Sequence, residues 1–65
     1  MKDNFTLDLI MALDGRDEPQ SPKDIYENND EITEHPTAVY LQLEHILKNS
    51  NEIEKIGDKY RLADR

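Results

Sequence analysis

Cysteine is absent from the 65 residues, which excludes disulfides and thiolate metal sites. His35 and His45 lie ten positions apart, a spacing that matches no standard zinc motif. A chain this short buries only about 60% of its unfolded surface, so its stability is thin without help. We therefore expect no metal and no cofactor, and we expect additional stability to come from association between copies of the chain.

A long hydrophobic run is also missing. The apolar cluster nearest the start, "LDLIMAL", is seven residues long and is interrupted by Asp8, so it is too short for a membrane span or a signal-peptide core. We expect a cytoplasmic protein without a membrane partner. The length corresponds to one domain, residues 1–65, which leaves no room for a catalytic pocket of useful size. An enzyme is therefore not expected.

Basic residues are scarce, since 8 Lys and Arg stand against 15 Asp and Glu and give a net charge of −7. Residues 1–35 hold three basic and ten acidic residues, whereas residues 36–65 hold five of each. The whole negative excess therefore lies in the first half. Such a charge is repelled by nucleic acid, so only the neutral second half is suited to approach DNA.

The acidic first half predicts two helices. Apolar residues recur at helical spacing over residues 4–13, and Gly15 provides a stop. The segment "SPKD" predicts a second helix, because Ser21 suits the N-cap, Pro22 the first helical position and Asp24 a capping box. A short strand near Gln20 is compatible with the polar connection before it. The inward residues expected of the two helices are Phe5, Leu9, Ala12, Leu13 and Ile25.

The longest periodic run, "HPTAVYLQLEHILKN", predicts a third helix. Thr33 is expected to cap it, with Pro36 in the first turn. Four apolar residues follow one face, and the opposite face is expected to be exposed, with Gln42 at its edge. The inward set is Val39, Leu43, Ile46 and Leu47, and the outward set is Thr37, Ala38, Leu41, Glu44, His45 and Lys48.

The last segment, "NEIEKIGDKYRLAD", predicts a β-hairpin with Gly57 and Asp58 as a two-residue turn. Alternation places Ile53, Tyr60 and Leu62 on one apolar face, which needs to pack against the helices. The opposite face carries a cross-strand ion pair. Pairing outward from the turn sets Ile56 opposite Lys59, Lys55 opposite Tyr60, Glu54 opposite Arg61 and Ile53 opposite Leu62.

These elements resemble a winged helix-turn-helix domain of the kind found in small bacterial and phage transcriptional regulators. The resemblance rests on "SPKDIYE" as second helix, "TAVYLQLEHILKN" as recognition helix and "IEKIGDKYRLAD" as strand, wing and strand. It implies a mostly α fold of three helices with a small C-terminal hairpin. It also implies a DNA-binding regulator of transcription in which the third helix enters the major groove.

Two functions remain open. For DNA binding, the third helix offers Gln42, His45 and Lys48 to the bases, and the wing offers three cations to phosphates. For binding a protein, the exposed apolar residues and the acidic segment "ENNDEITEH" supply a surface; a mimic of the charge of DNA is one form of this function. Leu7 and Met11 lie one turn apart on the outer side of the first helix and suggest a homodimer. The candidate DNA-binding residues are Thr37, Gln42, His45, Lys48, Lys55, Lys59 and Arg61, and the candidate partner-binding residues are Leu7, Met11 and Leu41.

Overall fold

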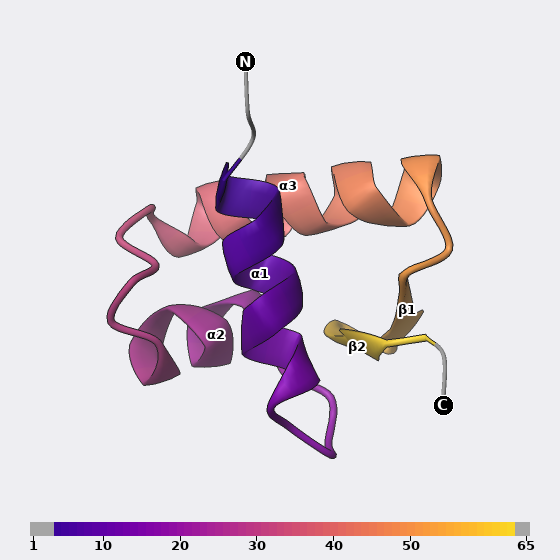
Figure 1. Cartoon of the computed structure of the whole chain (residues 1–65), viewed down its shortest axis with the longest axis horizontal. Coiled ribbons are helices and arrows are strands. Elements are labelled where there is room, and N and C mark those ends of the chain that lie inside the picture. Colours follow the sequence, from indigo (N-terminus) through magenta and orange to yellow (C-terminus); the bar gives the residue numbers. More distant parts are fainter. Residues whose placement is uncertain (1–3, 64–65) are drawn as a thin grey trace.

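Three helices precede a two-stranded antiparallel hairpin in the computed structural model, which describes residues 4–63. The longest helix runs across the molecule, and the first helix crosses in front of it. The hairpin lies near the C-terminal end of the longest helix (Figure 1). Within residues 4–63, no helix is long and apolar enough to cross a membrane. The predicted class, mostly α with a small hairpin, is confirmed. The elements are α1 (Asn4–Asp14), α2 (Pro22–Asn28), α3 (Pro36–Asn49), β1 (Ile53–Ile56) and β2 (Lys59–Leu62).

Helices and hairpin share a single core, as the apolar face of the hairpin requires. Every inward residue predicted for the helices is either buried or packed against this core. Tyr60 of β2 is fully buried among them, and Ile53 of β1 is 3% exposed. Burying an aromatic ring from the hairpin among helical leucines ties the two parts into one folding unit. The buried set is Leu9, Leu13, Ile25, Ile32, Val39, Leu43, Ile46, Ile53 and Tyr60.

The beginning of α2 follows the prediction from "SPKD". The Asp24 amide donates to Ser21 Oγ at 3.1 Å, and the Ser21 amide donates to Asp24 Oδ2 at 3.3 Å. This capping box satisfies two backbone N–H groups that the first turn leaves without partners. Pro22 stands at the start, where its missing N–H costs nothing. With only seven residues, α2 depends on Ile25, which is fully buried, for its attachment to the core.

The cap of α3 differs from the prediction. His35, not Thr33, is the N-cap, and its Nδ1 accepts a hydrogen bond from the Thr37 amide at 3.1 Å. Proline explains the shift, because the fixed φ of Pro36 suits the first helical position and leaves the residue before it as the cap. Thr33 lies two residues further out, in the connection between α2 and α3.

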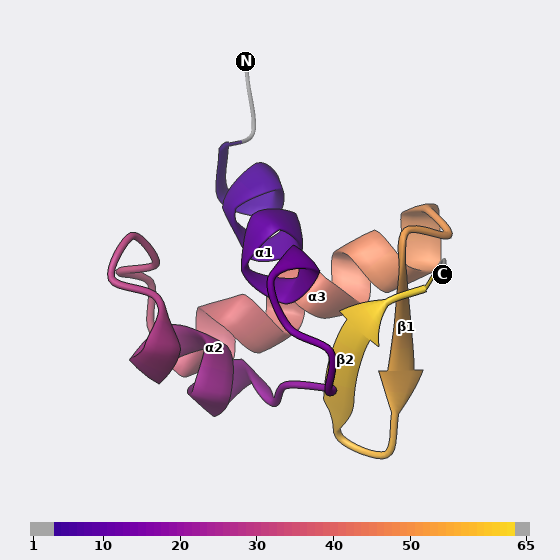
Figure 2. The same ribbon diagram turned by 60° about the horizontal axis from the view of Figure 1, so that its bottom comes forward.

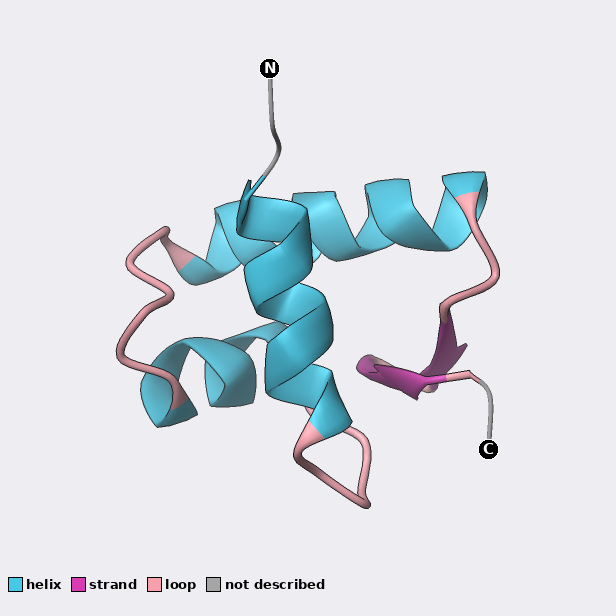
Figure 3. Ribbon diagram, in the orientation of Figure 1, coloured by secondary structure: helices cyan, strands magenta, loops and turns pink. Residues whose placement is uncertain are grey.

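The connection between α2 and α3 is held to the core by one apolar residue that the sequence did not single out. Ile32 is 2% exposed, and its amide donates to the Asn29 carbonyl at 3.1 Å. Asn29 in turn donates its side-chain amide to the Ile25 carbonyl at the end of α2. Figure 3 shows this long loop joining the two helices. The acidic side chains of the loop therefore surround an anchored backbone.

The predicted register of the hairpin is confirmed at all four pairs. Gly57 has φ of 65°, the left-handed conformation that favours glycine in a tight hairpin turn. The short third strand expected near Gln20 is present as a single bridge to Tyr60, with hydrogen bonds of 2.8 and 2.7 Å in the two directions. Figure 2 shows the chain before α2 passing beside β2. The position of β2 is thus fixed on both of its edges.

Candidate functional site

Four exposed residues opposite the buried side of α3 form its outer face: Thr37, Leu41, His45 and Lys48. Leu41 is 60% exposed, whereas Leu43, two positions later, is fully buried. All four belonged to the predicted outward set. The structure therefore brings together one apolar, one hydroxyl, one imidazole and one ammonium side chain along a continuous helical surface.

Gln42 does not join this outer face. Its Nε2 donates to Thr6 Oγ1 of α1 at 2.6 Å, and the residue is half-buried. The bond joins residues 36 positions apart and holds the flank of α3 against α1. Of the base-contacting residues that the sequence suggested on α3, Gln42 is the one that the fold directs toward another helix.

His45 has one ring nitrogen engaged within its own helix. Asn49 Nδ2 lies 3.2 Å from His45 Nδ1 and also donates to the His45 carbonyl at 2.9 Å. An amide NH₂ group only donates, so this contact makes Nδ1 the acceptor and leaves the proton of a neutral imidazole on Nε2. His45 thus offers an N–H donor at the ring atom that Asn49 does not contact.

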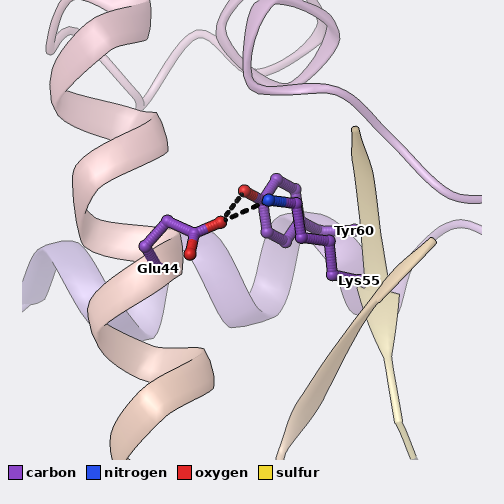
Figure 4. Close-up of polar contacts among 3 residues, drawn as sticks. All are labelled: Glu44, Lys55 and Tyr60. Atoms are coloured by element: carbon purple, nitrogen blue, oxygen red, sulfur yellow. Dashed lines mark hydrogen bonds and ion pairs between the residues drawn. The ribbon is translucent and has the colours of Figure 1, made fainter. Parts of the chain in front are cut away.

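Glu44, expected to face outward, is 34% exposed, but its carboxylate turns toward the hairpin. Its Oε2 accepts hydrogen bonds from Lys55 Nζ at 2.9 Å and from the Tyr60 hydroxyl at 2.5 Å (Figure 4). Glu44 lies on the border between the outer face and the flank, and the hairpin packs on that flank. A carboxylate at the border turns toward the nearest donors, and here these belong to β1 and β2. Glu44 therefore stays at the edge of the outer face, where it lines a hollow with Leu41, His45 and Lys48, and its charge is offset by the hairpin.

Charge and burial at this junction shift three pKa values. The hydrogen bond from Lys55, and then that from Tyr60, lower the pKa of Glu44. The same Glu44 contact raises the pKa of Lys55. Burial, followed by the hydrogen bond to Glu44, raises the pKa of Tyr60. The junction therefore holds a carboxylate, an ammonium group and a neutral phenol, the forms in which these bonds are made.

Two tyrosine rings complete the junction. Lys55 Nζ lies 5.8 Å from the ring centre of Tyr40 and 5.6 Å from that of Tyr60, within the range of a cation–π attraction. Periodicity and spacing in the sequence did not predict this cluster. Two signals were available: Lys55 pairs with Tyr60 across the hairpin, and Tyr40 precedes Glu44 by one helical turn. Only the packing of the hairpin on α3 joins the two pairs.

The three wing cations differ in their availability. Lys55 is paired with Glu44, and Arg61 is paired with Glu54 across the hairpin at 2.5 Å, as the register predicted. Lys59 is exposed beside the turn, and within residues 4–63 it forms no ion pair. Both pairs are partly exposed, so solvent weakens their attraction. Phosphate contacts by Lys55 and Arg61 would compete with these carboxylates.

Two further surfaces lie outside α3. Leu7 and Met11 of α1 are 53% and 62% exposed, in agreement with their expected outward position. A groove of about 450 Å³ separates the end of α1 from the hairpin, and its walls mix Arg16 and Arg61 with carboxylates. Among residues 4–63, no group of three or more His, Asp or Glu side chains is arranged to hold a metal ion.

The arrangement of three helices followed by an antiparallel hairpin is compatible with a winged helix. Comparison of the chain with models of protein families, with curated proteins and with solved structures finds no match. Function is therefore inferred from the side chains that α3 and the hairpin present.

Proposed function

We propose that this chain is a small, non-catalytic winged-helix regulator of transcription that binds duplex DNA in the cytoplasm. One observation carries the proposal: the outer face of α3 presents Thr37, Leu41, His45 and Lys48, while the carboxylate of Glu44 is bonded to the hairpin. A helix fits the major groove of B-DNA, and the ion pair with Lys55 offsets the charge of Glu44 at the border of this face, which reduces its repulsion from phosphates. In this proposal α3 enters the groove.

The distribution of charge supports this orientation. All of the negative excess belongs to residues 1–35, the part of the sequence that contains α1 and α2. The half containing α3 and the hairpin is neutral overall. If α3 faces the duplex and α1 faces away, much of the negative charge lies far from the phosphates. Salt screens the repulsion between charges that are more than about 10 Å apart. The acidic loop before α3 is the part that still opposes close approach.

The hairpin contributes phosphate contacts in this proposal. Lys59 is ready to bind a phosphate, whereas Lys55 and Arg61 must first exchange Glu44 and Glu54 for it. With Lys48 on α3, two to four phosphates are neutralised. The logarithm of the binding constant should then fall against the logarithm of salt concentration with a slope of roughly −2 to −4. The affinity is accordingly modest.

A homodimer is the second part of the proposal. Leu7 and Met11 lie one turn apart on α1, both more than half exposed. Pairing α1 with its copy around a two-fold axis buries this stripe and presents two α3 helices to DNA. A dimer also increases the stability of a domain whose own core is small.

Binding of a labelled duplex pool at increasing salt tests the proposal. The wild-type chain should retard the DNA at low salt and release it steeply as salt rises. Lys48→Ala should weaken binding several-fold and reduce the salt slope by about one, because one phosphate or base contact is lost. Arg16→Ala removes the same charge from the connection after α1 and serves as the matched control. Absence of binding at every salt concentration contradicts the proposal.

The second candidate function is an acidic winged-helix module for protein–protein interaction, an adaptor or inhibitor whose charge mimics that of DNA. It is favoured by the internal pairing of Lys55 and Arg61 and by the exposure of Leu41. The acidic side chains around the loop before α3, Asp30, Glu31 and Glu34, supply complementary charge for a basic partner. The same assay separates the two functions, since this module binds no DNA at any salt concentration.

A further inference from the structure

The centre of the outer face of α3 is apolar. Leu41 is 60% exposed and stands one turn after Thr37 and one turn before His45. An exposed leucine alone needs no explanation, because much of any protein surface is apolar. This one, however, occupies the middle of the surface that the proposed function directs into the major groove.

The neighbouring polar side chains are directed away from that centre. Gln42, the residue best suited to a bidentate contact with adenine, donates to Thr6 of α1. Glu44, whose carboxylate suits the amino group of cytosine, accepts from Lys55 and Tyr60. The groups that would read hydrogen-bonding edges beside Leu41 are therefore engaged within the fold. At the centre stands the hydrocarbon of Leu41, with the hydrogen-bonded Glu44 at the edge of the same hollow.

The surface beside Leu41 has room for an apolar group. A hollow of about 370 Å³ borders this residue, and Leu47 contributes to its wall. His45, Lys48 and Glu44 lie at the same hollow, so it combines hydrocarbon with two side chains able to donate hydrogen bonds and with a carboxylate whose Oε2 is bonded to the hairpin. A methyl group carried on a base edge would meet Leu41 there without displacing a buried side chain.

Resting on the proposed DNA binding, we propose that Leu41 contacts the 5-methyl group of a thymine and makes α3 selective for an A·T pair at that position. Thymine alone among the four bases displays a methyl group in the major groove. Contact between this methyl and a leucine removes hydrocarbon from water on both sides. Leu41 is thus a specificity-determining residue, flanked by His45 Nε2 and Lys48 as donors to neighbouring acceptors.

Replacing thymine by uracil tests the proposal, because it removes the methyl group and preserves base pairing. Binding sites are first selected from a random duplex library with the wild-type chain. The dissociation constant is then measured for the selected duplex and for duplexes in which one thymine at a time is uracil. We expect one position at which the substitution weakens binding about four-fold, the effect of losing one buried methyl group.

Two variants assign this effect to its residue. Leu41→Ala should bind the thymine and uracil duplexes equally, and it should fold normally because the side chain is exposed and alanine favours helices. Leu7→Ala makes the same change at an exposed leucine of α1 and should keep the four-fold preference.

Three results overturn the proposal, and they differ in what else they overturn. DNA binding that is indifferent to uracil at every position, or a thymine preference that survives Leu41→Ala, contradicts the role of Leu41 and leaves DNA binding standing. Failure to select any site, with no binding at low salt, contradicts both the role of Leu41 and the proposed function. In that last case the exposed leucine is better explained as part of a surface that binds protein.

Discussion

At the scale of single residues, Glu44 joins the outer face of α3 to the hairpin. One carboxylate oxygen accepts from both Lys55 and Tyr60, and the ammonium group of Lys55 also lies over two tyrosine rings. The hairpin is therefore held in a defined position beside α3 by charge as well as by its buried face. Because the same contact turns this carboxylate toward the hairpin, Glu44 links the stability of the fold to the surface proposed for DNA.

Glu44 should make the stability of the domain sensitive to acid. Its pKa is lowered in the folded protein by Lys55 and then Tyr60, so its contribution is present above its ordinary pKa of 4.5 and is lost as the pH falls through the lowered value. Glu44→Gln should therefore unfold at lower urea concentration than wild type at neutral pH. The difference should shrink as the pH falls below 4.5.

Urea unfolding of both proteins across this acid range measures the effect. Glu27→Gln makes the same charge change at an exposed position of α2 and serves as the control. A gap between wild type and Glu44→Gln that stays constant with pH would show that the carboxylate charge does not hold the hairpin.

Helical periodicity could not predict the direction in which the side chain of Glu44 points. Spacing along α3 correctly separates Leu43 from Leu41, because these two lie on opposite sides of the helix. Glu44 and Gln42 lie near the borders of the outer face, where the direction of a side chain depends on what packs beside the helix. Their partners come from β1, β2 and α1. Only the tertiary arrangement supplies that information.

At the scale of elements, α3 should respond very differently to the loss of its two central leucines. Leu43 is fully buried, so Leu43→Ala should cost roughly 2–5 kcal/mol and leave little or no folded protein, given the small total stability of such domains. Leu41→Ala should change the free energy of unfolding by less than about 0.5 kcal/mol. Circular dichroism during urea titration measures both, and equal losses would mean that α3 is rotated about its axis.

The hairpin should depend on its turn. Gly57 has φ of 65°, and a β-branched residue there is strained by its own backbone, since a Cβ would meet no other atom within 4 Å. Gly57→Val should therefore destabilise the domain by roughly 1–3 kcal/mol. Gly15→Val, at a glycine with equal space but no positive φ, is the matched control in thermal melting. Similar melting temperatures for the two variants would contradict a strained turn.

The elements that were predictable carry their determinants within a few residues. "SPKD" contains the whole capping box of α2. Gly57 with Asp58 forms the turn that sets the register of the four pairs between β1 and β2. The bridge from Gln20 to Tyr60 was weaker in the sequence, because one pair leaves no alternating pattern. Ile32 gave no periodic signal either, as a lone apolar residue in a polar loop. Its burial depends on how the helices pack against one another, which the local sequence does not specify.

At the scale of the whole molecule, negative charge opposes association between copies of the chain, whereas exposed hydrophobic surface favours it. The acidic excess of residues 1–35 keeps copies of the chain apart, whereas the apolar stripe of Leu7 and Met11 lies within that same half. Asp8 and Asp14 flank the stripe, so two α1 helices meeting in parallel would bring like charges together. An antiparallel or offset contact separates them better. Screening of this repulsion by salt should favour the dimer.

Association should therefore strengthen with salt, in contrast to the proposed binding of DNA, which should weaken. Sedimentation at micromolar concentration should show a dimer whose population grows as salt is added. The double variant Leu7→Lys, Met11→Lys should remain a folded monomer, because it replaces the apolar stripe with charge at two exposed positions. Leu41→Lys changes an equally exposed leucine on α3 and should still dimerise. If the wild-type chain stays monomeric at every salt concentration, α1 is not a dimer interface, and DNA would then have to be bound by one α3 at a time.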